Sequence, residues 1–264
     1  MMNIDQRSIP NDLAVEAQGH VALVTLKRPP HNFFDLYWIR DLAGIFEALD
    51  REIHCRAIVL RAEGSSFCAG ADFSKPRAQT PAGAPASNPL YDEAVRLFRC
   101  TKPVIAAVQG PAVGGGLGLA LMADFRVTCP EARFSANFNR LGFHPGFGLS
   151  VTLPRVIGIQ QAAQMFYSGR RVPGEEAFAI GLADRLVAKA DLFDAAIEMA
   201  QEFAASAPIA VQSTRATLRA GLAEAVREAT AHEGREQSRH YSTEDFKEGV
   251  KAMAERRSPV FIGR

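Results

Sequence analysis

Cysteine is scarce in this chain, and its arrangement excludes two common kinds of small-protein scaffold. The 264 residues contain four cysteines, Cys55, Cys68, Cys100 and Cys129, with no CxxC spacing and no matching pair of histidines. Neither a disulfide framework nor a zinc site is therefore indicated. Disulfides are rare in reducing compartments, so this pattern fits a reducing cytosol and predicts a cytoplasmic protein.

An excess of charge and a long hydrophobic run are also missing. Lys and Arg number 30 and Asp and Glu 29, which gives a formal net charge of +1 and little attraction for nucleic acid or an anionic membrane. No window approaches the ~18 uninterrupted apolar residues of a membrane span. The opening MMNIDQRSIP has no basic segment followed by an apolar run, as a signal peptide would. We expect a soluble protein with no nucleic-acid or membrane partner.

Short apolar runs alternate with segments of helical periodicity along the first 150 residues. Buried strands alternating with helices are typical of an α/β core with mostly parallel strand pairing. From about Pro154 the pattern becomes helical, and a helix with an apolar face is expected over 191–207. The Pro-rich segment 78–90 has no periodicity and predicts a surface loop. The other expected elements are strands over 20–28, 57–62, 102–110 and 125–130, a helix from Asp35, a helix ending near Cys100 and a helix over 117–123.

Three consecutive glycines, Gly114 to Gly116, stand at the start of the apolar helix, and Gly118 follows inside it. A phosphate-binding P-loop would need Lys-Ser or Lys-Thr after the last glycine, and a dinucleotide fingerprint would need glycine where Leu119 stands. The GxSxG nucleophile elbow is absent as well. What remains is a glycine turn that feeds a helix N-terminus, where free N–H groups can receive developing negative charge. This is half of an oxyanion hole, and the other half is expected in GSSFCAGADF, residues 64–73.

Several motifs together resemble the crotonase family of enoyl-CoA hydratases and isomerases. They are SSFCAGAD, KPVIAAVQGPAVGGGLGLALMADFRV, LPRVIG, the early VTLKRPPHN and the late KEGVKAMAERRSPVF. The resemblance implies a crotonase-like spiral of repeated β-β-α units over residues 1–200 and a C-terminal helical region over 201–264 that mediates oligomerisation. It also implies an acyl-CoA thioester as substrate, a homotrimer or a dimer of trimers, and no metal or redox cofactor.

The resemblance also assigns site residues. The thioester carbonyl would sit between the backbone N–H groups of Ala71 and Gly115, and glycine suits the second position because a Cβ would obstruct the substrate. The polarised carbonyl would stabilise an enolate, an intermediate shared by hydration, double-bond shift, decarboxylation and thioester hydrolysis. Arg28 and Lys27 are candidates for the CoA phosphates, and Met253 holds the place of an aromatic residue near the adenine, among Lys251, Arg256 and Arg257. Further expected pocket positions are Ala69, Asp72, Gly114, Gly118, Phe138 and Gly146.

The sequence departs from the family at both usual glutamates, because those positions hold Gly118 and Phe138. Neither residue transfers a proton, which argues against the two-carboxylate addition of water. Gly118 is expected to leave space where the carboxylate would stand. His144 is the alternative acid or base, since histidine titrates near neutral pH, although a structural role, in which it hydrogen-bonds within its own turn, is the commoner one for such a residue. A decarboxylase, a thioester hydrolase and a non-catalytic acyl-CoA-binding subunit remain alternatives.

Other polar residues near these positions carry weaker expectations. Asn137, Asn139 and Arg140 flank the lost glutamate, and an Asn there would orient water or a polar acyl group unless the three are simply solvated turn residues. Asp72 is expected to cap a helix N-terminus. Cys68 is expected to be a small buried packing residue.

Overall fold

The structure is a computed structural model that describes residue 2, residues 9–72 and residues 88–264. Most of the Pro-rich segment expected to form a loop, positions 78–87, lies outside the described residues.

A six-stranded sheet forms the centre of the described fold, in the order β1-β2-β3-β4-β6-β9. Its first two strands pair antiparallel, and every later neighbour pairs parallel. The α/β core with mostly parallel pairing is thus confirmed. The edge strand β1 has no counterpart among the expected elements. The strands are β1 (Leu13–Gln18), β2 (Val21–Leu26), β3 (Ala57–Ala62), β4 (Val104–Val108), β6 (Phe125–Thr128) and β9 (Arg185–Leu186).

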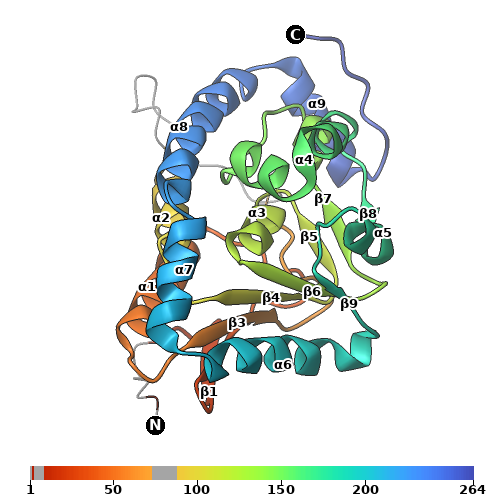
Figure 1. The fold of residues 1–264 in the computed structure, drawn as a ribbon. Coiled ribbons are helices and arrows are strands. Elements are labelled where there is room, and N and C mark those ends of the chain that lie inside the picture. The colour runs from red at the N-terminus through yellow and green to blue at the C-terminus, as the bar shows by residue number, and fades with distance from the viewer. Residues whose placement is uncertain (1, 3–8, 73–87) are drawn as a thin grey trace.

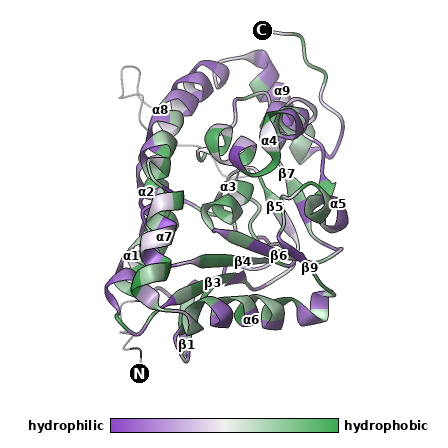
Figure 2. Ribbon diagram, viewed as in Figure 1, coloured by the Kyte–Doolittle hydropathy of each residue, from purple (hydrophilic) through white to green (hydrophobic). Residues whose placement is uncertain are grey.

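Both faces of this sheet are covered, which explains why its strands read as continuous apolar runs. Along β3, Ile58 and Leu60 join the larger core, whereas Ala57 and Val59 point to the other face, as the two-residue period of a strand requires. Helix α6 (Leu192–Ala205) covers this second face, and Figure 1 shows it running beneath β3 and β4. In Figure 2, β3, β4 and the helix at the centre of the fold are mainly green.

A second, three-stranded sheet in the order β5-β7-β8 stands beside the first. Each of its first two strands follows a strand of the large sheet and precedes a helix, so that β4-β5-α3 and β6-β7-α4 repeat one β-β-α unit. This repeat, with the helical C-terminal part, confirms the crotonase-like fold. The bounds are β5 (Pro111–Val113), α3 (Gly115–Met122), β7 (Arg133–Ser135), α4 (Leu149–Ser168) and β8 (Val172–Pro173).

Helices follow the apolar periodicity closely at some places and depart from it at others. Helix α1 begins where expected, because the side chain of Asp35 accepts a hydrogen bond from the N–H of Trp38 and caps it. Helix α3 begins two residues earlier than expected, directly after Gly114. Helix α4 contains Pro154 and changes direction at Gly158, whose φ is 76°. The remaining helices are α1 (Leu36–Arg51), α2 (Pro89–Phe98), α5 (Gly174–Ala179), α7 (Pro208–Leu218), α8 (Leu222–His240), α9 (Glu244–Ala254) and the short 3-10 turns Asn137–Leu141 and Lys189–Asp191.

Candidate active site

Two turns meet beyond the carboxyl ends of neighbouring parallel strands. The first follows β3, and the second follows β4 and β5. Backbone hydrogen bonds join them, because Cys68 donates to the carbonyl of Pro111 at 3.1 Å and accepts from Val113 at 3.0 Å. Ligands of open α/β sheets bind at this end of the strands. Segments about 45 residues apart in the sequence thus form one backbone surface.

Gly70 is the point of closest approach between the two turns. Its φ is +82°, and a Cβ placed on it would lie 2.9 Å from the carbonyl oxygen of Val113 and 3.5 Å from the amide nitrogen of Gly115. Both the left-handed backbone and the crowding require glycine here. Ala71 is the next residue along the chain, so its amide nitrogen is bonded to the carbonyl carbon of Gly70 at this junction.

Neither of these two amide groups is used within the described structure. The N–H of Ala71 and the N–H of Gly115 donate no hydrogen bond to any described residue. Gly115 is the first residue of α3, and its N-cap Gly114 (φ 57°) has no side chain to satisfy the free amides. A helix N-terminus carries partial positive charge. Each of the two turns therefore carries an amide donor that no described residue accepts, which is the kind of group that stabilises a developing oxyanion.

An aromatic wall closes the site on the side of the two lost glutamates. The space beside Gly118 is not empty, contrary to expectation. A Cβ at Gly118 would lie 2.7 to 2.9 Å from three atoms of Phe147, which is fully buried and has a φ of 64°. The ring of Phe34 lies 5.5 Å from that of Phe147 and covers Gly115. The ring of Phe138 stands 3.6 Å from the corresponding point at Gly114.

The backbone directly after Phe147 is hydrogen-bonded to a buried carboxylate from a distant helix. Glu233 of α8 is fully buried, and its carboxylate accepts hydrogen bonds from the N–H of Gly148 at 2.8 Å, the N–H of Ser150 at 3.0 Å and the hydroxyl of Ser150 at 2.6 Å. It thereby caps the start of α4. Burial raises the pKa of this carboxyl. Sequence reasoning missed both residues, although the position of Phe147 between Gly146 and Gly148 is a visible signal of a tight turn.

His144 lies in the same turn as Phe147 and is half-buried. Its Nδ1 lies 2.9 Å from the carbonyl oxygen of Pro145, and its backbone N–H donates to Nδ1 of His240 at 3.1 Å. The ring is 5.7 Å from that of His232 and 6.5 Å from that of His240. Burial, together with the nearby His144, lowers the pKa of His240. The contact with Pro145 is the local one expected of a structural histidine, while Nε2 is free of any described partner.

The residues beside Phe138 differ in their surroundings. The side-chain oxygen of Asn137 is 3.8 Å from the position of a Cβ at Gly114, which makes it a polar group close to the oxyanion turn. Asn139 instead donates to the carbonyl of Tyr167 at 2.7 Å, and Arg140 is exposed. Of the three, Asn137 alone is brought to the candidate site.

Several expected binding residues lie around the first turn. Ala69 donates to the carbonyl of His31 at 2.9 Å. Asp72 is half-buried next to Ala71, and the positions that follow it, where a helix N-terminus is expected, lie outside the described residues. Cys68 is fully buried, and burial raises the pKa of its thiol to about 12, which agrees with a packing role. Gly146 is buried against the hydroxyl of Tyr91.

The two residues that are candidates to bind the CoA phosphates differ in whether their side chains are already paired within the protein. Arg28 is committed within the protein, because it pairs with Asp12 at 2.5 Å and with Asp35 at 2.7 Å and lies over the ring of Trp38. Although burial opposes the charge, the two carboxylates raise the pKa of Arg28. Lys27 follows β2 at the same edge of the sheet as the two turns, and its side chain makes no hydrogen bond or ion pair to a described residue.

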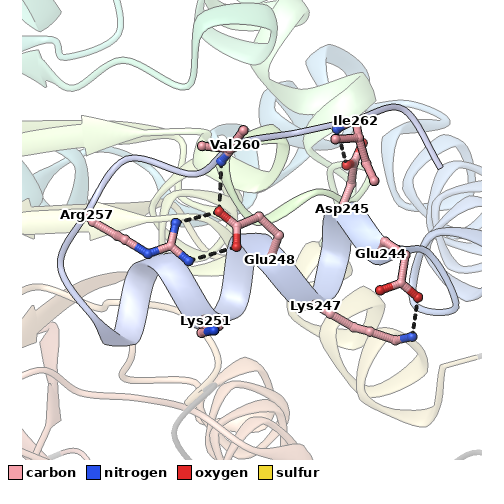
Figure 3. Close-up of a pocket in the computed structure, with 8 residues that line it drawn as sticks. All are labelled: Glu244, Asp245, Lys247, Glu248, Lys251, Arg257, Val260 and Ile262. Carbon is pink, nitrogen blue, oxygen red and sulfur yellow. Dashed lines mark hydrogen bonds and ion pairs between the residues drawn. The ribbon is translucent and has the colours of Figure 1, made fainter.

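The C-terminal tail lies against α9, near the residues expected around the adenine. Arg257 pairs with Glu248 at 2.5 Å, and the same carboxylate accepts from the N–H of Val260 at 2.8 Å (Figure 3). Met253 is 43% exposed, and Lys251 is exposed on the same helix. These residues are remote in sequence from the oxyanion turns, and across the described ranges no hydrogen bond or ion pair joins them to those turns.

The described residues provide neither a metal site nor a membrane-spanning helix. Across the described ranges, no group of three or more His, Cys, Asp or Glu residues is placed to hold a metal ion. Among the helices of those same ranges, none combines the length and the apolar character needed to cross a membrane.

Known proteins resemble this chain in sequence and in fold over nearly its whole length. A family model described as enoyl-CoA hydratase/isomerase matches residues 16–264. The chain is 31% identical to the short-chain-enoyl-CoA hydratase of Clostridium acetobutylicum over 94% of this chain and 96% of that protein. It is 34% identical to the (E)-benzylidenesuccinyl-CoA hydratase of Thauera aromatica, over 95% and 99%. The crystal structure of an enoyl-CoA hydratase/isomerase from Pseudoalteromonas atlantica T6c superposes with a TM-score of 0.84 at 28% identity, over 96% of this chain and all of that one.

Proposed function

Because this chain belongs to the enoyl-CoA hydratase/isomerase family, we propose that it is an enzyme that binds an acyl-CoA thioester through the backbone N–H groups of Ala71 and Gly115. The observation that carries this proposal is the convergence of the two turns at Gly70, which leaves both amides without an internal acceptor. Two such donors stabilise the enolate that forms when a proton leaves the α-carbon. In other enzymes each donor contributes about 2.7 to 4 kcal/mol to the lowering of the barrier.

We propose further that proton transfer uses a group other than side chains at 118 and 138. Phe147 fills the space beside Gly118, and Phe138 adds a second ring, so the addition of water between two carboxylates is disfavoured. His144 is the proposed acid or base, because it shares the turn of Phe147 and its Nε2 is free of described partners. Asn137 is proposed to hold a polar acyl group or water by its amide. Isomerisation fits this set, while decarboxylation and thioester hydrolysis are the rival reactions.

A turnover assay with crotonyl-CoA and a matched 3-enoyl-CoA tests the proposal. We expect acyl-CoA turnover that falls about 10²- to 10⁴-fold in His144→Ala, with His54→Ala, an exposed histidine beyond α1, as the control. Equal turnover in the two variants would reject the role of His144. Tight binding of several acyl-CoAs without turnover of any would instead identify a binding subunit, and rapid hydration would show that a carboxylate has been missed.

The remaining proposals concern binding and assembly. Lys27 and Arg28 are proposed near the CoA phosphates, with Lys27 the stronger candidate because its side chain is not already paired. We propose a core over residues 1–200 and a homotrimer, or a dimer of trimers, assembled through residues 201–264. Support comes from apolar side chains exposed in that region, among them Ile209 at 83% and Leu218 at 69%. Light scattering on Ile209→Asp and on the exposed control Ile53→Asp tests the assembly.

We propose a cellular location and a metabolic role from the state of the cysteines and from the family. The four cysteines are free and buried, which is compatible with a reducing cytoplasm, and a role in fatty acid metabolism follows the family. No metal or redox cofactor is proposed to take part. Turnover that survives dialysis against a chelator would agree with this, and restoration by an added metal ion would contradict it.

A further inference from the structure

A polar cleft lies at the opposite end of the sheet from the oxyanion turns. It has a volume of about 410 Å³ and is formed by the end of α2, the face of α7 and the first turn of α8. Asp124, behind it, accepts from the N–H of Val104 at the start of β4. Arg219 of the cleft donates to Met122 at the last turn of α3, whereas Gly115 of the candidate active site opens that helix. The two sites are therefore separate.

More cationic than anionic side chains line this cleft, and the carboxylate of Asp50 accepts hydrogen bonds from the lining residue Thr101. Arg215 and Arg219 both pair with Asp124, each at 2.8 Å, so one carboxylate serves two guanidinium groups. Arg99 adds a third cation at the rim, and its side chain forms no hydrogen bond or ion pair with a described residue. The carboxylate of Glu224 also lines the cleft but is held by Arg227.

Two buried donors of these arginines have no acceptor. Nη2 of Arg215 and Nε of Arg219 are shielded from solvent and make no hydrogen bond within the described structure. The side chain of Arg215 is only 9% exposed. Burial, with the neighbouring Arg215, lowers the pKa of Arg219. Buried polar groups are nearly always paired, so an unpaired one calls for a missing partner.

The first turn of α8 supplies a third kind of donor to the same cleft. Helix α8 is 19 residues long, and its N-cap Gly221 provides no side-chain hydrogen bond. Ala223 and Glu224 of this turn line the cleft, and their N–H groups donate to no described residue. Free amides at a helix N-terminus, combined with the helix dipole, form a binding site for anions.

We propose that this cleft binds a small oxyanion of the phosphate-monoester or carboxylate class. Such a group balances the second arginine of the pair on Asp124 and meets the N-terminus of α8. Arg99 closes over the anion from the rim. Planar guanidinium groups suit the oxygens of both chemical classes.

Calorimetric titration of the full chain with inorganic phosphate, and separately with acetate, tests the proposal. We expect one saturable site at low ionic strength, and the tighter of the two ions identifies the class. Arg99→Glu should weaken binding by at least about tenfold, equivalent to about 1.4 kcal/mol. Arg235→Glu makes the same charge change at an exposed position further along α8 and should leave the affinity unchanged.

The outcomes distinguish specific binding in the cleft from non-specific electrostatic attraction of an anion to the protein surface. The proposal is supported if the affinity for the ion falls in Arg99→Glu but not in Arg235→Glu, and if saturating crotonyl-CoA leaves the affinity of the unmodified protein unchanged. This result does not depend on the function proposed for the other site. Absence of saturable binding of either ion, or equal weakening in both variants, would overturn it. Arg219→Gln leaves Arg215 paired with Asp124. If that variant unfolds cooperatively but gains no thermal stability from phosphate, the cleft is again supported.

Discussion

Replacement of Gly118 by alanine probes how tightly the aromatic wall is packed against α3. The new Cβ would lie 2.7 to 2.9 Å from three atoms of Phe147, closer than carbon atoms approach in folded proteins. Phe147 is fully buried and cannot swing into solvent. Overpacking of this kind costs about 1 to 3 kcal/mol.

Gly44→Ala is the matched control, because Gly44 lies inside α1 and a Cβ there meets no atom within 4 Å. Both substitutions gain about 1 kcal/mol of helix propensity, which cancels in the comparison. The free energy of unfolding, measured in urea, should therefore be about 1 to 3 kcal/mol lower for Gly118→Ala than for Gly44→Ala.

A third variant shows whether Phe147 causes this difference. Phe147→Gly removes the ring and its Cβ, at a cost of about 3 to 5 kcal/mol for the lost packing, and relieves a left-handed backbone conformation. In that background the gap between the two alanine variants should close. If Gly118→Ala is as stable as Gly44→Ala while Phe147 is present, the wall is not packed as described and the argument against a second carboxylate fails.

Three further predictions concern a buried cation, the C-terminal tail and the junction of the two turns. Asp184→Ala leaves the buried guanidinium of Arg126 without its carboxylate, so urea unfolding should show a loss of about 3 to 5 kcal/mol, whereas Asp194→Ala on the surface of α6 should cost far less. Arg257 and the Val260 amide lower the pKa of Glu248 to about 2. A depressed folded pKa means that the contribution to stability is present above pH 4.5 and lost as the pH falls through 2. In the folded protein the Val260 amide resonance should therefore shift with a midpoint near pH 2, and a flat titration would contradict the contact. Gly70→Ala should weaken both stability and acyl-CoA binding, because its Cβ meets the Val113 carbonyl, whereas Gly19→Ala, also left-handed but uncrowded, should affect stability alone; equal binding loss in both would refute the assignment.

Local sequence patterns were sufficient to predict the buried strands of the core and the positions of the two turns. The apolar runs of β3 and β4 specify strands buried on both faces, and the glycines at 114 to 116 mark a turn that side chains cannot occupy. Gly70 is crowded by backbone from the second turn, which is why a short motif identifies a junction between distant segments.

The features that the sequence did not predict depend on contacts between residues far apart in the chain. The sequence predicts open space beside Gly118, but its neighbour in the structure is Phe147, which lies 29 residues further along and has a left-handed backbone conformation. The cap on α4 comes from Glu233, 85 residues beyond Gly148. No periodicity links such pairs. Strand β1 escaped notice because it is an antiparallel edge strand whose last three residues are exposed.

A structure of the protein with a non-reactive acyl-CoA analogue tests the central claim most directly. The account predicts that the thioester oxygen lies about 2.7 to 3.1 Å from the amide nitrogens of both Ala71 and Gly115. An oxygen that contacts only one of these nitrogens, or lies elsewhere in the protein, would contradict it.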